Sequence, residues 1–179
     1  MELAIPTGIN IAAPRKLASN VLGATTNLIE HHVRLPGTRN IVVCFDIPFI
    51  FFEKILEKRN VPMDDLIFVD AVTRVSGDIP IGRENVRMMN GPFFLPEIYA
   101  EIALILREDS GGDKCVIIDN LTNTITFNSM DSVKKFLKNL IELFLEVKLK
   151  RAVLIIERER NPMLFNYMKN DIEGVNVFE

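Results

Sequence analysis

Few residue patterns in this chain could do chemistry, and the first is an aspartate that ends an apolar run. Asp119 directly follows the run CVII at positions 115–118. A short β-branched run of this kind predicts a buried strand. A carboxylate at the end of such a strand can cap the following turn of backbone.

Other catalytic patterns find little support. His31 and His32 are adjacent in a predicted helix, so their side chains diverge by about 100° and cannot share one metal ion without distortion. We expect both histidines to be exposed. The sequence contains no Gly-x-Ser-x-Gly, Cys-x-x-Cys, His-Glu-x-x-His or Gly-x-Gly-x-x-Gly pattern, which argues against hydrolase, zinc and dinucleotide sites.

A third pattern is a segment at residues 71–93 with three Gly, two Pro and little periodicity, which predicts a long connection after a strand. Binding residues of α/β proteins often follow strand ends, so this segment is a candidate recognition element for an acidic protein or anionic ligand. Its arginines either bind that partner or pair with nearby acids in the chain. The candidate partner-binding residues are Arg74, Arg83 and Arg87.

The composition bounds the function. The 179 residues include 48% hydrophobic and 25% charged residues, as in one globular domain, and we treat residues 1–179 as a single domain. Lys and Arg number 21 against 24 Asp and Glu, so the formal net charge of -3 does not favour nucleic acid or anionic lipid. Cys44 and Cys115 lie in apolar runs and are expected to be buried. Without a signal-peptide pattern or an apolar run that could span a membrane, we expect a cytoplasmic protein.

Strands and helices alternate along the predicted chain. Apolar runs predict strands at 8–12, 40–45, 66–69, 115–118, 152–156 and 175–178. Apolar residues at three- and four-residue spacing predict helices between them, most clearly at 131–144. This alternation indicates a three-layer α/β/α fold, with a mostly parallel central sheet covered on both faces.

The order of these elements resembles the RecA-like ATPases, and within them the KaiC-like branch, over roughly residues 8–178. The resemblance depends on the runs NIVVCFD at 40–46, LIFVDA at 66–71 and CVIIDN at 115–120 with the helix after it. It implies a RecA-like P-loop NTPase topology. It also implies that CVIIDN is a Walker B strand, with Asp119 near Mg²⁺, and that Asp46 is a candidate for the acid that activates water. Ile47 follows Asp46 where a second acid is expected, so no catalytic residue is assigned.

The phosphate-binding loop of that family is degenerate in this sequence. A P-loop requires G-x-x-x-x-G-K-[ST], because glycines let backbone N–H groups reach phosphate, Lys neutralises it and the hydroxyl binds Mg²⁺. The aligned residues are A-P-R-K-L-A-S-N, so all four defining residues are replaced. Two cations in this segment could still meet an anion at a helix N-terminus, or could simply be solvated. The candidate nucleotide-binding positions are Ala13, Arg15, Lys16, Ala18, Ser19 and Asn20.

We therefore predict a non-catalytic, KaiC-like regulatory or scaffolding protein that binds a protein partner or itself and needs no cofactor. The alternative is a divergent ATPase that uses ATP and Mg²⁺, with Lys16 or a partner subunit supplying the missing charge. The apolar segments 48–52 and 88–96 belong either to the core or to a subunit interface, and on the second interpretation we expect a homodimer or larger assembly.

Overall fold

The computed structural model describes residues 7–13, 21–76, 83–108 and 112–178. The strands are β1 (Gly8–Ala12), β2 (Thr38–Cys44), β3 (Leu66–Asp70), β4 (Val86–Met88), β5 (Asp113–Ile118), β6 (Arg151–Ile155) and β7 (Val175–Phe178). The helices are α1 (Val21–Val33), α2 (Phe49–Lys58), α3 (Thr73–Ser76), α4 (Leu95–Arg107), α5 (Thr124–Phe127), α6 (Met130–Glu146) and α7 (Pro162–Asn170), with a 3₁₀ turn at Leu121–Asn123.

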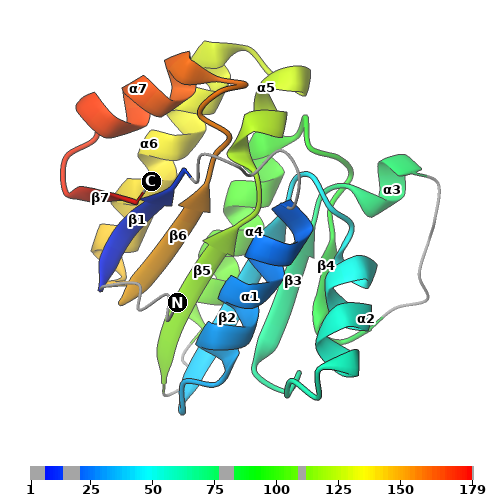
Figure 1. Ribbon diagram of the computed structural model, residues 1–179. Helices are drawn as coiled ribbons and strands as arrows, with labels where there is room; N and C mark the ends of the chain where they lie inside the picture. The colour runs from blue at the N-terminus through cyan, green and yellow to red at the C-terminus, as the bar shows by residue number, and fades with distance from the viewer. Residues whose placement is uncertain (1–6, 14–20, 77–82, 109–111, 179) are drawn as a thin grey trace.

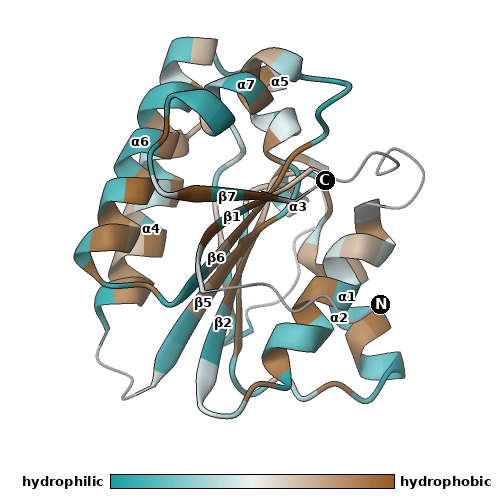
Figure 2. Cartoon of the chain, turned by 60° about the vertical axis from the view of Figure 1, so that its left-hand side comes forward, coloured by the Kyte–Doolittle hydropathy of each residue, from teal (hydrophilic) through white to brown (hydrophobic). Residues whose placement is uncertain are grey.

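All seven strands form one parallel sheet in the order β4-β3-β2-β5-β6-β1-β7. The first two helices cover one face, and α4 and α6 cover the other (Figures 1 and 2). The fold class predicted from the sequence, a three-layer α/β/α arrangement of RecA-like topology, is therefore confirmed. Because every strand points the same way, the polar residues that follow the strands gather at one end of the sheet, which we call the carboxyl edge.

Alternation along each strand divides the buried side chains into two cores. In β2, Ile41 and Val43 face α4 and α6, whereas Val42 and Cys44 face α1 and α2. Successive side chains of a strand point to opposite faces, so a strand covered on both sides must be apolar throughout. This requirement explains the unbroken apolar runs in the sequence and the burial of both free cysteines, Cys44 and Cys115.

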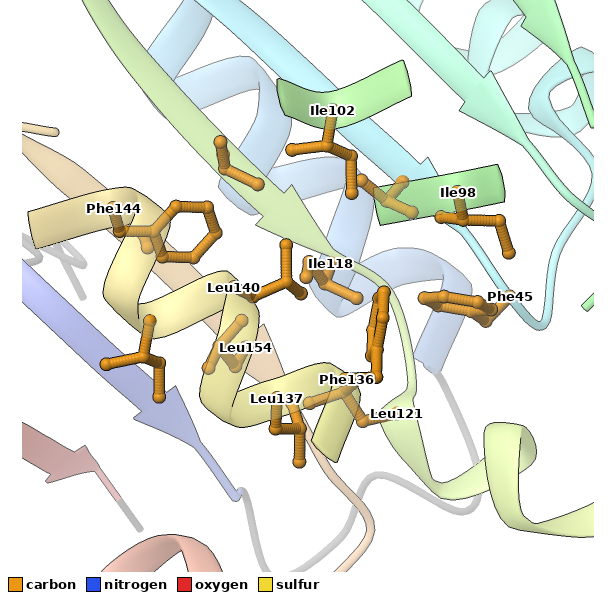
Figure 3. Packing of buried hydrophobic residues seen from close by; sticks show 14 of the residues in the cluster. Phe45, Ile98, Ile102, Ile118, Leu121, Phe136, Leu137, Leu140, Phe144 and Leu154 are labelled. Atoms are coloured by element: carbon orange, nitrogen blue, oxygen red, sulfur yellow. The ribbon is translucent and has the colours of Figure 1, made fainter. Parts of the chain in front are cut away.

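The core beneath α4 and α6 is the larger of the two, and Figure 3 shows part of it. The ring of Phe136 meets that of Phe45 edge to face, with centroids 6.0 Å apart. Leu137, Leu140 and Phe144 extend the same apolar stripe along α6. Each such side chain contributes about 1.5–3 kcal/mol by leaving water, so α6 is held mainly by this face.

Capping residues fix where α6 begins and ends. The Ser129 hydroxyl accepts a hydrogen bond from the Ser132 N–H at 3.2 Å, which satisfies one donor of the first turn. The helix stops at Val147, and Lys148 then takes a left-handed conformation with φ of 52°. These local signals and the apolar stripe agree, so this helix was predictable from the sequence alone.

Two expectations were wrong. The segment 71–93 is more than a connection, because it contains α3 and the edge strand β4, which pairs in parallel with β3. The prediction missed β4 because three residues are too short for a periodic pattern. His32 is buried rather than exposed, because it lies on the face of α1 that is turned toward the sheet, and its Nδ1 lies 2.8 Å from the Leu28 carbonyl. Burial lowers the pKa of His32.

Candidate functional site

Asp119 directly follows β5 at the carboxyl edge and is completely buried. Its carboxylate accepts hydrogen bonds from the backbone N–H groups of Phe45, of Ile47 at 3.0 Å and of Asp46 at 3.3 Å. Both carboxylate oxygens are thus used to hold the chain that leads from β2 to α2. The geometry is that of a backbone anchor, but the anchored backbone belongs to residues 45–47 rather than to the turn that follows Asp119, as the capping interpretation expected.

The environment of Asp119 also changes its acidity. Burial raises the pKa of this carboxyl to about 7, and the nearby charge of Asp46 adds to the rise. The N–H groups of Phe45 and Ile47 act in the opposite direction, because they stabilise the ionised form.

Asp46 lies beside Asp119, so the structure brings together the two acids singled out in the sequence. The Asp46 side chain accepts hydrogen bonds from the Asn120 amide at 2.8 Å and from the Asn123 amide. The same Asn120 amide also donates to Glu157, which follows β6. One amide thus bridges two carboxylates and reduces their mutual repulsion.

Asn120 occupies its position at some conformational cost. Its φ of 31° and ψ of 71° lie in the left-handed region, which asparagine tolerates better than most residues. The side chain is completely buried. Glu157 is held in addition by Arg160 at 2.9 Å, and its N–H donates to the Thr122 hydroxyl at 2.8 Å. Sequence reasoning missed this network, although the run DNLTN at 119–123 was its signal.

Asp70, at the end of β3, is a second backbone anchor at the same edge. It is completely buried and accepts hydrogen bonds from the N–H groups of Phe49 at 2.7 Å and of Val72 and Thr73 at 2.8 Å. The Thr73 hydroxyl donates a fourth at 2.8 Å. Asp70 therefore ties the beginning of α2 to the beginning of α3.

Of the candidate nucleotide-binding residues, the structure describes Ala13. Ala13 follows β1 and is completely buried, and the remaining candidate nucleotide-binding residues lie outside the described residues: Arg15, Lys16, Ala18, Ser19 and Asn20. Among the residues that the structure describes, no group of three or more His, Cys, Asp or Glu side chains could hold a metal ion.

The three candidate arginines have separate partners within the chain. Arg74 donates to Asn90 at 2.7 Å, Arg83 pairs with Glu53 of α2, and Arg87 pairs with Glu101 of α4 at 3.3 Å. Since α2 and α4 cover opposite faces of the sheet, Arg83 and Arg87 are directed to different layers. Arg83 and Arg87 thus pair with acids of the chain, which is the second of the two roles that the sequence left open, whereas the partner of Arg74 is an amide.

A groove lies near the first turns of α4 and α6 and holds about 290 Å³. We call it the α4/α6 groove; its lining residues are Phe93, Leu95, Pro96, Asn128, Ser132, Lys135, Phe136 and Asn139. Phe93 and the neighbouring Phe94 are 44% and 48% exposed. The apolar segment 88–96 is thus divided, because Met89 and Leu95 are in the core while the two phenylalanines remain at the surface.

The fold is a three-layer α/β/α arrangement of RecA-like topology. At its carboxyl edge, the acids that end the strands accept hydrogen bonds from the backbone of the same chain. The chain is similar to the crystal structure of an uncharacterised protein from Pyrococcus horikoshii in complex with an unknown peptide. The TM-score is 0.68 at 13% sequence identity, over 96% of this chain and 77% of that chain, so the likeness shows the fold alone. No family model and no curated protein matches the chain. Within the described residues, no helix is long and apolar enough to cross a membrane.

Proposed function

We propose that this chain is a non-catalytic, KaiC-like protein of RecA fold that acts as a regulatory or scaffolding binding module. The observation that carries the proposal is the position of Asp119. A Walker B aspartate must present its carboxylate to Mg²⁺, whereas both oxygens of Asp119 face backbone N–H groups of residues 45–47.

The remaining parts of an ATPase site point the same way. Asp46 is held by two asparagine amides, which compete with any water that it would have to activate. In the sequence, the P-loop glycines, lysine and hydroxyl are replaced by Ala13, Ala18, Ser19 and Asn20. Each replacement removes a separate contact to phosphate or Mg²⁺, so we expect no resident cofactor and no ATP hydrolysis.

The partner that we propose is a protein. The structural neighbour from Pyrococcus horikoshii was crystallised with a peptide, which supports peptide binding by this chain as a proposal. We also propose self-association, which light scattering would measure. The half-exposed side chains of Phe51, Phe93 and Phe94 leave apolar surface of the segments 48–52 and 88–96 open to a second copy. The net charge of -3 gives no reason to expect nucleic acid as a partner. We further propose a cytoplasmic location, as expected from the sequence without a signal-peptide pattern.

A divergent ATPase is the second candidate. Asp46, Asp119 and Glu157 do meet at one sheet edge, where α/β proteins commonly bind ligands. In that case ATP and Mg²⁺ would be the cofactors, and Lys16 or a partner subunit would supply the charge that the P-loop lacks.

Titration calorimetry with ATP and Mg²⁺, together with a phosphate-release assay, separates the two candidates. We expect no turnover above background and no binding stronger than about millimolar, because the contacts that a P-loop makes to phosphate are replaced. Micromolar binding with turnover that is lost in Asp119→Asn would establish the ATPase instead. Far-ultraviolet circular dichroism of this variant must match the unsubstituted protein, so that unfolding is not mistaken for lost catalysis.

A further inference from the structure

The α4/α6 groove has the size of a side-chain pocket. Its volume of about 290 Å³ lies just below the ~300–1,000 Å³ of sites that enclose whole small molecules. Leu95 and Phe136, both buried, provide apolar walls. A groove of this size and lining fits one or two apolar side chains of a peptide better than it fits a nucleotide.

Exposed aromatic side chains stand beside the groove. Phe93 and Phe94 contact each other, with ring centroids 4.7 Å apart, and remain 44% and 48% exposed. Phe127, which precedes the groove residue Asn128, is 50% exposed. Aromatic side chains bury a large apolar area when a partner covers them, and they therefore contribute strongly to the energy of protein interfaces.

The loop that carries these phenylalanines is fixed in place. The Asn128 amide donates to the carbonyls of Pro92 at 3.0 Å and Thr124 at 2.8 Å, which ties the loop to α5. Gly91 has a φ of +150°, and a Cβ there would lie 2.6 Å from the Phe93 ring. A binding surface that is already ordered loses little conformational entropy when a partner binds, so exposure of these rings does not depend on a flexible loop.

The charge beside the groove favours an acidic partner. Lys135 is exposed and forms no ion pair with any described residue. Asp131, four residues earlier on the same helix, does not pair with it either. The other two lysines of this turn are engaged, since Lys134 lies over the Tyr167 ring at 5.0 Å and Lys138 approaches Glu142 at 4.0 Å. The acids in the first turns of α4 and α6 are Glu97 and Asp131, and neither lines the groove. Among the described residues, Lys135 is thus the one charged side chain that does.

We propose that the α4/α6 groove binds a peptide segment of a partner protein that carries a Phe or Leu anchor with an Asp or Glu close to it. The anchor enters the groove against Phe93 and Phe136, and the acidic residue pairs with Lys135. This inference rests on the proposed function as a binding module and specifies its site and the chemistry of its partner.

A phage-displayed library of random peptides, selected on the whole protein, tests the proposal. We expect the selected sequences to share an aromatic or leucine anchor with an acid nearby. Selected peptides are then synthesised and titrated against variants. Phe93→Ser with Phe94→Ser should weaken binding about tenfold or more, and Lys135→Glu about three- to tenfold, as for loss of central and peripheral contacts respectively.

Two matched substitutions serve as controls. Phe51→Ser changes an equally exposed phenylalanine on α2, and Lys138→Glu reverses an exposed charge one helical turn beyond the groove lysine. Both should leave peptide affinity within about twofold, because neither residue lines the groove. All four variants should keep the thermal transition of the unsubstituted protein, because these side chains are exposed.

The outcomes separate this inference from the proposed function. Peptides that bind Phe93→Ser/Phe94→Ser normally, or a selected set that is basic, would overturn the groove assignment and leave a binding module with another site. Absence of any selected peptide together with micromolar ATP binding would remove the binding-module proposal itself. Light scattering that shows a dimer dissociated by Phe93→Ser/Phe94→Ser would assign the groove to a second copy of this chain and refute the partner peptide.

Discussion

Asp70 and Asp119 are completely buried and accept hydrogen bonds from their own backbone, whereas Phe93 and Phe94 remain nearly half exposed beside an open groove. The first region contains carboxylates, which are common in catalytic sites, and the lining of the groove contains none. The contrast indicates that the strand-end acids of this protein stabilise its fold, while the α4/α6 groove remains available to a partner. Substitutions at the carboxyl edge should therefore lower stability, and substitutions at the groove should lower binding.

The largest loss of stability is expected for Asp70→Ala. This change removes the acceptor of four hydrogen bonds, three of them buried, and leaves the N–H groups of Phe49, Val72 and Thr73 without it. Buried donors without an acceptor are costly, so the free energy of unfolding in urea should fall by about 3 kcal/mol or more. Asp64→Ala, at an exposed position, is the control and should change it by about 0.5 kcal/mol or less. A loss below about 1 kcal/mol at Asp70 would contradict the anchoring role.

The next effect is a pH dependence that Asp119 imposes on stability. Its folded pKa of about 7 exceeds the unfolded value near 4, so the folded protein keeps a proton that the unfolded chain releases. The stabilisation that this proton gives to the folded protein is therefore fully present below about pH 4, and it is lost as the pH rises to about 7. About three pH units correspond to at most ~4 kcal/mol.

Asp119→Asn isolates this contribution, because an amide does not titrate. The free energy of unfolding of both proteins is measured in urea from about pH 4 to about pH 8. As the pH rises, the unsubstituted protein should lose stability relative to the variant, and the difference should become constant above about pH 7. A pH-independent difference between the unsubstituted protein and Asp119→Asn would show that burial does not raise this pKa.

The sequence predicted most of the fold because local pattern and tertiary environment agree there. Runs such as CVII are apolar at every position because both faces of the strand are covered, and the stripe on α6 continues over several turns. The burial of His32 was not predictable, since adjacency in the chain does not say which face of α1 meets the sheet. Strand β4 was too short to detect.

The candidate site was only partly predictable for a related reason. The sequence shows that Asp119 ends a strand. The backbone N–H groups that donate hydrogen bonds to its carboxylate, however, lie more than seventy residues away in the chain. Separations of 74 and 37 residues likewise hide the hydrogen bonds from Asn120 to Asp46 and to Glu157. The groove is formed by residues 93–96 and 128–139, and only the fold brings these together. Contacts between such distant segments depend on topology, which single-residue patterns do not encode.

The smallest effects on stability are expected for Arg74, Arg83 and Arg87. Their replacement tests whether these arginines stabilise the fold, as the carboxyl-edge acids do, or bind a partner, as proposed for the groove. Arg83 pairs with Glu53, whose side chain is only 5% exposed, so Arg83→Ala leaves a nearly buried carboxylate without its cation. We expect this change to lower the free energy of unfolding by about 1–2 kcal/mol. Arg74 and Arg87 have partners nearer the surface, and their replacement by Ala should lower it by about 0.5 kcal/mol or less. If the triple variant also binds groove-selected peptides with unchanged affinity, these arginines stabilise the fold as the carboxyl-edge acids do. A loss of affinity without a loss of stability would instead make them part of the recognition surface that the sequence suggested.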